Sequence, residues 1–509
     1  MKPWLSIDLG TTNSAVAYYG PRGPEVIKVD GRELVPSVVM AVPNENAAEG
    51  EDKWQIVVGQ KAVRAREKSP RSPYCYTSFK RNFGAVFNPE EATDEQMVAG
   101  EFGALHYQGP DGVTYAPEVL AAYVLDKLCS AAEAKLQTEI TSAVICVPAT
   151  YNIAQRNAIK KAAELVGLTE VELLDEPVAA AIAHGYQIDD DKAHRILVVD
   201  IGGGTTDVAA FEIGKGLFKV LGTNGAALVG GDDWDRHLRS YVLNLHQVEH
   251  ENSTLATQQD ALRLLLTEAE DVKRRLSDDD VAEFRVEDIT IDKQSGADVH
   301  VITRISRDHM DEVTTALLND IDDAMARTMA EAKTKDPKFT IHDLDAVILV
   351  GGQTRVKAIQ RRVAAFAQKN PRSDVDAELA VVLGGAVQAG IREGRLASIT
   401  IKNITSHSYS IETHDKPEDV ATEIVRKGTA YGTKATWWLS NRDRDQTLMT
   451  LRLLQGDSKD PAKNLMVWEH QIEIDPGEPR EADIQLDIEI SATGEPILEV
   501  AGVVYGRAI

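Results

Sequence analysis

Apolar positions up to about residue 393 form two alternating patterns, short unbroken runs and longer segments that repeat every three to four residues. The runs are typical of buried strands and the longer segments of amphipathic helices. Strands are expected at Ala143–Val147, Leu173–Leu174, Ile196–Ile201 and Ala346–Val350, and helices from Pro117 through Ala131, over Gln155–Val166, Val178–His184 and Gln258–Leu276, and around Gly384–Glu393. This alternation predicts an α/β fold with a first lobe over about residues 1–190 and a second lobe over about 191–393.

The pattern changes after about residue 395 to short segments in which every second residue is apolar. The clearest is Ile484–Ile490, and further strands are expected at Thr436–Leu439, Leu448–Leu454, Met466–Ile474 and Ile497–Val504, with turns at Gly456-Asp457, Pro476-Gly477 and Thr493-Gly494. Several strands at this spacing predict a small antiparallel β-sandwich over residues 406–509, joined by a linker over 394–405. The sequence continues only about five residues past the last strand, so we expect no C-terminal helical lid.

Two of the expected strands lead into closely matching turns. Ile7-Asp8-Leu9 precedes Gly10-Thr11-Thr12-Asn13-Ser14, and Val199-Asp200-Ile201 precedes Gly202-Gly203-Gly204-Thr205-Thr206-Asp207. Glycine lets the backbone approach an anion closely, and a tight turn directs several N–H groups at one point. The Asp near each strand end can hold the water shell of a metal ion. The pair predicts a polyphosphate site closed from opposite sides, and two glycine-rich hairpins without a ligand are the alternative.

Composition and charge limit the classes of function. The chain has 509 residues, of which 43% are hydrophobic and 27% charged, as in ordinary soluble globular proteins. Its net charge of −25 argues against a general binder of nucleic acid or anionic membranes, because phosphate contacts need a basic surface. The three cysteines (Cys75, Cys129 and Cys146) form neither a disulfide framework nor a zinc motif, and no signal sequence precedes the first strand. We therefore expect a cytoplasmic protein.

A third glycine-containing turn is a candidate adenosine site. The apolar strand Val347–Val350 ends in Gly351-Gly352, against which a flat base or ribose could lie, and Arg355 follows. On the preceding helix, one face carries Glu270, Lys273, Arg274 and Ser277. A solvated charged face is the alternative.

Other candidates are less specific by themselves. Lys80 cannot be distinguished from a surface lysine by spacing, and Glu176 begins a helix, where a carboxylate is favoured in any case. His246-Gln247-Val248-Glu249-His250 matches the inverted zinc-peptidase pattern. Its polar surroundings and the missing downstream carboxylate argue against zinc. The chain contains no P-loop sequence.

Taken together, these segments resemble the 70-kilodalton heat-shock chaperone family, which belongs to the superfamily of actin and the sugar kinases. The matching segments are Ile7–Ser14, Lys80-Arg81, Val147–Asn152 with Gln155-Arg156, Asp175–Ala183, Asp200–Asp207, Gly230–Asp233, Lys273–Ser277 and Val350–Arg355. They follow the family's order through about residue 393. A looser match to the family's β peptide-binding domain is given by Ser410–Thr413, Gln455–Asp457 and Gly494–Val500.

The resemblance implies a two-lobed, actin-like ATPase that binds ATP or ADP with magnesium and potassium. It implies nucleotide contacts from Gly10, Thr11, Thr12, Asn13, Gly202, Gly203, Gly204, Gly230, Gly231, Asp232, Glu270, Lys273, Arg274, Ser277, Gly351, Gly352, Arg355 and Glu378. By the same resemblance, Asp8, Glu176 and Asp200 would hold magnesium mostly through its waters. Lys80 would stabilise charge at the γ-phosphate, and Asp200 with Thr205 would orient the attacking water.

The same resemblance implies a chaperone cycle in which ATP hydrolysis is coupled to the binding and release of unfolded or extended peptide segments. Pro148 and Arg156 stand where the family relays the nucleotide state to the peptide domain. Ile411, Leu439, Met449 and Leu451 align with positions of the peptide groove, although core residues of a sandwich would look alike. The implied partners are a J-domain co-chaperone and a nucleotide exchange factor.

The chain departs from the family's pattern at several positions. Gln353 stands where the family has Ser, Asp232 where it has Glu, and Asp376-Ala377-Glu378 where it has Asn-Pro-Asp. The linker segment Ile399–Asn403 keeps about half of the usual apolar side chains, which predicts weaker or different coupling. His414 and Arg442 stand where small or apolar residues arch over the peptide.

Three other functions remain open at this stage. A nucleotide-switched scaffold for one partner is suggested by the altered linker and groove. A filament-forming ATPase would give polymers that sediment with ATP, and a sugar kinase would consume ATP only with a polyol.

Overall fold

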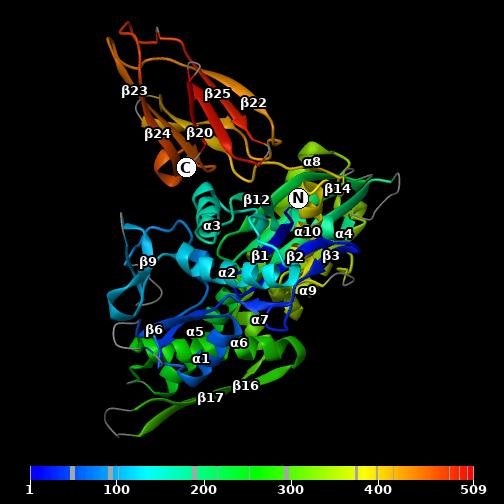
Figure 1. Ribbon diagram of the computed structural model, residues 1–509, viewed down its shortest axis with the longest axis vertical. Coiled ribbons are helices and arrows are strands. Elements are labelled where there is room, and N and C mark those ends of the chain that lie inside the picture. The colour runs from blue at the N-terminus through cyan, green and yellow to red at the C-terminus, as the bar shows by residue number, and fades with distance from the viewer. Residues whose placement is uncertain are drawn as a thin grey trace.

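The computed structural model of the chain describes residues 2–507 except 46, 48–51, 90–95, 101–102, 186–191, 215, 251–252, 292–296, 373–375, 397–398, 416–417, 481, 492 and 501–502. Figure 1 shows an α/β body with a β-sandwich at one end.

The first lobe is built on a mixed sheet in the order β12-β11-β1-β2-β3. Its strands are β1 (Trp4–Leu9), β2 (Asn13–Gly20), β3 (Gly23–Val26), β11 (Ser142–Val147) and β12 (Glu170–Asp175), with β4 (Val35–Pro36) paired to β2. Side chains alternate between the two faces of the sheet, as a strand requires. Ala143, Ile145 and Val147 pack with α2 (Pro117–Leu136) and α3 (Ile153–Leu165), whereas Val144 and Cys146 face the opposite side.

The second lobe repeats this arrangement on a sheet in the order β18-β13-β14-β15-β19. Its strands are β13 (His194–Ile201), β14 (Thr206–Gly214), β15 (Leu217–Ala226), β18 (Ala346–Val350) and β19 (Thr400–Lys402). One face packs on a core that includes α5 (Gly231–Glu249), α6 (Gln259–Asp278), α8 (Thr315–Lys335) and α9 (Lys357–Ala367). The short strand β19 lies in the predicted linker and pairs in parallel with β15.

Two helices lie between the two sheets. These are α4 (Glu176–Gly185) and α10 (Ala380–Arg392), whose apolar residues pack with the inner faces of β11 and β13. Helix α10 packs so closely on its neighbours that a Cβ at Gly384 would overlap the carbonyl of Ala179 on α4, and one at Gly385 would overlap Ser6 on β1. Glycine at both positions therefore permits the crossing on which the spacing of the lobes depends.

Smaller elements surround the cleft side of the lobes. The remaining elements of this region are β5 (Val39–Pro43), β6 (Trp54–Val58), α1 (Gln60–Lys68), β7 (Cys75–Tyr76), β8 (Met97–Ala99), β9 (Leu105–Gln108), β10 (Thr114–Tyr115), β16 (Val281–Ile291), β17 (Asp298–Ser306) and α7 (Arg307–Val313). The hairpin of β16 and β17 stands at the end of the molecule opposite the β-sandwich (Figure 1).

The C-terminal part is a sandwich of two four-stranded antiparallel sheets, ordered β21-β20-β23-β24 and β22-β25-β26-β27. Its strands are β20 (Tyr409–Asp415), β21 (Glu418–Val425), β22 (Lys434–Leu439), β23 (Leu448–Gln455), β24 (Leu465–Glu473), β25 (Ile484–Ile490), β26 (Pro496–Val500) and β27 (Val503–Arg507). The prediction of one strand over Ile497–Val504 is wrong. This segment is divided between β26 and β27, which pair with each other as a hairpin. The predicted α/β lobes and antiparallel β-sandwich are otherwise confirmed as architecture.

Candidate functional site: the cleft between the lobes

The two matching turns lie against each other. Each joins two antiparallel strands, β1 to β2 in the first lobe and β13 to β14 in the second. A Cβ at Gly203 would overlap the hydroxyl of Thr12, and a Cβ at Gly204 would lie 2.9 Å from Thr11 Oγ1. The structure therefore brings together Gly203 and Gly204 with Thr11 and Thr12, across the lobes.

Hydrogen bonds hold the first turn. Ser37 donates its backbone N–H to Thr12 O (2.8 Å) and its hydroxyl to Gly10 O (2.7 Å). The Ser37 and Ser14 hydroxyls are also 2.8 Å apart. Ser37 was not predicted as a site residue, since no local motif points to it.

The second turn is held by the start of α5. Gly231 N donates to Gly202 O (3.0 Å), and Asp232 N donates to Gly203 O (2.8 Å). The predicted residues Gly230, Gly231 and Asp232 therefore lie beside the turn, and α5 begins there at Gly231. Since the first N–H groups of α5 already donate to the carbonyls of Gly202, Gly203 and Gly230, this end of the helix would favour an anion through its dipole and not through those donors.

Buried carboxylates gather beneath the turns around one ammonium group. Lys80 Nζ lies 2.9 Å from Glu176 Oε1, and Lys80 is only 3% exposed. Burial disfavours its charge, but Glu176, Tyr151 and Asp8 outweigh that effect and raise the pKa of Lys80.

Asp8, Asp200 and Asp207 complete this carboxylate cluster. Burial, with Glu176 adding to it, raises the pKa of Asp8 to about 7 and that of Asp207 to about 7. The pKa of Asp200 is raised well above its ordinary value, first by burial and then by Glu176 and its other carboxylate neighbours. Burial is the largest cause of these raised pKa values and the neighbouring carboxylates add to it, and a cation bound beside the carboxylates would favour their charged forms.

The cluster fits a divalent cation. Asp200 Oδ2 is buried and has no hydrogen-bond partner within the described residues. No group of three or more His, Cys, Asp or Glu side chains in the described ranges is arranged to ligate a metal directly. Magnesium keeps several of its waters, so carboxylates set back from one another suit it. His246 and His250, whose ring centres are 4.5 Å apart, belong to no such group in the part of the chain that the structure describes.

Arg81 connects the lobes at the rim of this cluster. Its guanidinium forms two hydrogen bonds with Asp233 on α5, Nη1 to Oδ2 at 3.0 Å and Nη2 to Oδ1 at 2.9 Å. Asp233 in turn accepts from Gly230 N at 3.0 Å. Asp233 is a further residue missed at the sequence level, because 152 residues separate it from Arg81.

The proposed adenosine residues fall into two groups. Lys273 is buried and donates to Gly231 O (2.8 Å) and Asp235 Oδ2 (2.9 Å), so it does not belong to a solvated face. A Cβ at Gly231 would lie 3.0 Å from Lys273 Nζ and 3.1 Å from Gln353 Oε1, which shows that these side chains converge.

The second group lies closer to solvent. Arg274 pairs with Glu270 at 2.5 Å, and Arg355 pairs with Glu378 at 2.5 Å; both arginine side chains are about 60% exposed. Ser277 Oγ donates to Lys273 O at 3.4 Å. Gly351 has a φ of 82°, and its Cβ position would overlap Ile201 O, so the third turn packs directly on the second.

The lobes and the β-sandwich share a set of hydrogen bonds around Arg156. Arg156 donates from Nη2 to Asp175 Oδ1 (2.6 Å) and from Nε to Tyr151 O (3.2 Å). Asn403, just after β19, donates to Asp175 Oδ2 (2.8 Å). Tyr151 N in turn donates to Pro148 O (3.1 Å). Both predicted relay residues therefore lie on this connection.

Further contacts hold the sandwich against the lobes. Ile153 N donates to Gln455 Oε1 at 2.9 Å, and Lys427 Nζ donates to Asn224 Oδ1 at 2.7 Å. Lys160 forms an ion pair with Glu495. In Figure 1, α3 lies directly below the sandwich.

The predicted groove residues lie mostly inside the sandwich. Ile411, Met449 and Leu451 are buried in its core, and Leu439 packs against that core from a partly buried position. His414 pairs with Asp419 at 2.8 Å, and Arg442 lies 3.8 Å from Asp443. A peptide contact by the four residues stays a prediction.

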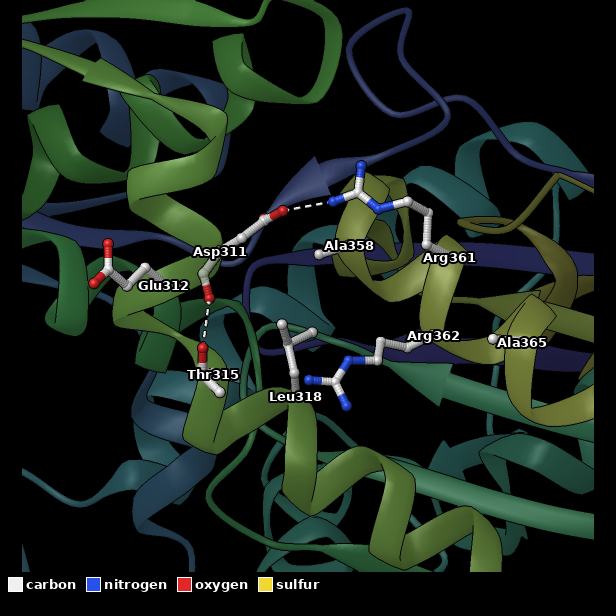
Figure 2. Close-up of a pocket in the computed structure, with 8 residues that line it drawn as sticks. All are labelled: Asp311, Glu312, Thr315, Leu318, Ala358, Arg361, Arg362 and Ala365. Carbon is white, nitrogen blue, oxygen red and sulfur yellow. Dashed lines mark hydrogen bonds and ion pairs between the residues drawn. The ribbon is translucent and has the colours of Figure 1, made fainter.

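A separate hollow of about 450 Å³ lies between α7, α8 and α9 (Figure 2). It is bordered by the Arg361–Asp311 pair at 2.5 Å, and by Arg362 beside Leu318. None of the predicted site residues lines it.

No helix in the described part of the chain is long and apolar enough to span a membrane.

Comparisons with known proteins agree with this geometry. Residues 4–504 match the family model described as Hsp70 protein. The chaperone protein DnaK of Deinococcus proteolyticus is 34% identical over 500 residues, which cover 96% of this chain and 75% of that protein. The chain therefore belongs to the Hsp70 family, whose members are ATP-driven molecular chaperones that bind ATP or ADP with Mg²⁺.

Proposed function

We propose that this chain hydrolyses ATP in the cleft between the two turns and uses the nucleotide state to control peptide binding in its β-sandwich. One observation carries the proposal: the two turns touch across the lobes directly above the buried carboxylates and Lys80. Polyphosphate between them would be held by backbone N–H groups from both lobes. Each lobe alone would offer half of the site.

The residues of the carboxylate cluster and the turns would have separate roles in hydrolysis. Asp8, Glu176 and Asp200 would hold the magnesium through its waters, and Asp207 adds negative charge nearby. Bound magnesium would neutralise charge on the phosphate oxygens. Lys80 would stabilise the charge that develops at the γ-phosphate, while Asp200 and Thr205 orient the attacking water. Positioning and electrostatics would then supply the catalysis.

The proposal also includes potassium. The family resemblance implies it, and several buried carboxylates, among them Glu176, Asp200 and Asp207, lie around the Lys80 ammonium group. Replacing potassium by sodium should therefore slow hydrolysis.

Coupling to the sandwich would pass through continuous contacts. Tyr151 donates its hydroxyl to Lys80 O (3.2 Å) and accepts from Arg156, which binds Asp175, the residue before Glu176. Asn403 extends this chain of bonds to the linker. Nucleotide binding or hydrolysis would change the charge beside Lys80 and Glu176. Small movements of the bonded neighbours Tyr151, Arg156 and Asp175 would then carry this change to Asn403 and the sandwich.

The proposed ligand of the sandwich is an unfolded or extended peptide segment. Its partners would include a J-domain co-chaperone and a nucleotide exchange factor, in keeping with the family. The three cysteines are free thiols, which supports a reducing cytoplasmic setting.

Removing residues 395–509 should leave an ATPase that no longer responds to peptide, because the proposed binding domain is gone. A second truncation, removing 406–509, keeps β19 on the edge of β15 and is the matched control for loss of that strand. Steady-state phosphate release, measured with and without a peptide that binds the full chain, checks both. A full chain that responds to no peptide on an array, with or without ATP, would favour the scaffold function instead.

A further inference from the structure

The joint between the β-sandwich and the ATPase lobes contains a histidine, His407. It lies between β19 and β20, is half-buried, and has Nδ1 3.1 Å from the Ser406 hydroxyl. Charged groups from four separate segments act on it: Arg156 of α3, Asp175 at the end of β12, Lys427 in the turn after β21, and Asp457 in the turn after β23.

The two carboxylates near this histidine already have donors. Asp175 accepts from Arg156 (2.6 Å) and Asn403 (2.8 Å), and Asp457 Oδ1 accepts from Ser408 N (3.2 Å). The two cations stay in the joint, because Arg156 is tied to Asp175 and Lys427 to Asn224 at 2.7 Å. The region thus holds two cations and two carboxylates that already accept hydrogen bonds, so a proton on His407 would add one positive charge in excess to a partly desolvated joint.

We propose that His407 makes the docking of the β-sandwich on the ATPase lobes sensitive to protons. The neutral imidazole suits the docked arrangement, and the imidazolium favours separation of the two parts. This inference rests on the proposed function, since docking is the state through which ATP would control the sandwich.

The direction of the effect follows from linkage. Burial, then Arg156 and Lys427, lower the pKa of His407 from its ordinary value of 6.5 to about 4. The docked form therefore disfavours the proton, so docking is unaffected above about pH 6.5 and weakens as the pH falls toward 4. If separation restores the ordinary pKa, the docking constant falls about 4-fold at pH 6 and about 30-fold at pH 5.

The test is the docked fraction of the full chain, measured by small-angle X-ray scattering with and without magnesium-ATP at pH 7.5, 6.5, 5.5 and 5.0. Wild type should expand as the pH falls. His407→Gln, which cannot take up the proton, should stay compact at pH 5.0. His407→Lys should be partly expanded already at pH 7.5, and a thermal melt of each variant checks that it is folded.

His470→Gln is the matched control, because this histidine lies in the same sandwich on the exposed strand β24. It should follow wild type at every pH. The cleft carboxylates titrate in all of these proteins, so only the difference between wild type and His407→Gln reports on His407. Equal pH dependence in those two proteins overturns the inference. Calorimetry showing no ATP binding at any pH would contradict the proposed function. The role of His407 would still be decided by comparing the scattering of wild type and His407→Gln without nucleotide.

Discussion

Replacing Lys80 with alanine should lower ATP hydrolysis by a factor of about 10²–10³ while ATP still binds. The ammonium group is 3% exposed and lies 2.9 Å from Glu176, in a region where charge interactions are strong. The two turns, which would contribute the backbone donors to the phosphates, remain in the variant. Binding should therefore persist when turnover is lost.

A loss of turnover in Lys80→Ala must be distinguished from a loss of folding. Loss of Lys80 leaves Glu176 buried and unpaired, which can destabilise a protein by about 3–5 kcal/mol. Thermal melts and ATP titration of the same samples show whether the cleft is intact. Lys61→Ala, which removes an exposed lysine on α1, is the matched control and should behave as wild type. Turnover of Lys80→Ala within twofold of wild type would refute the proposed role.

Arg156→Ala should abolish the response of hydrolysis to peptide while basal hydrolysis stays within a few-fold of wild type. The Arg156 side chain is 13% exposed, and its removal leaves Asp175 without its 2.6 Å partner. Breaking such a pair costs about 3–5 kcal/mol, and here that cost falls on the joint rather than on the phosphate turns. Steady-state phosphate release across a peptide titration measures the effect.

Lys161→Ala on the same helix is the matched control. Lys161 pairs with Glu164 in an exposed i,i+3 arrangement that contributes at most about 1 kcal/mol. It should retain the peptide response. If Arg156→Ala responds to peptide as wild type does, coupling does not pass through Arg156, and the relay assignment must be abandoned.

Elements with a strong local pattern were predictable from the sequence. The strand Ala346–Val350 and the start of the helix at Pro117 agree with β18 and α2 to the residue, since each carries its own periodicity and boundary signals. The two matching turns were recognisable from their Asp, Gly and Thr residues, and each joins a pair of antiparallel strands in the structure. The hairpin of β16 and β17 was not predicted from the charged region near residues 277–300. Its signal was weak, although Ala282, Phe284 and Val286 alternate with charged residues there.

Contacts between distant segments could not be predicted in this way. Asp233 meets Arg81 across 152 residues, and Asn403 meets Asp175 across 228. The pairing of the linker strand β19 with β15 was also not predictable, because it is made through backbone hydrogen bonds, which do not depend on side-chain type. The weaker or different coupling expected from the linker stays a prediction. The roles of the individual cleft and groove residues, the domain boundaries and the absence of a lid stay predictions.

The most direct measurement is a calorimetric titration of the full chain with ATP, with and without magnesium, repeated on Gly203→Ala. A methyl group at Gly203 would overlap the Thr12 hydroxyl, so the Thr12 side chain or the second turn must move. Wild type should bind magnesium-ATP at one site, more weakly without the metal, and the variant should lose about 10- to 100-fold in affinity. No heat from wild type, or equal affinity in the two proteins, would contradict a nucleotide held between these turns.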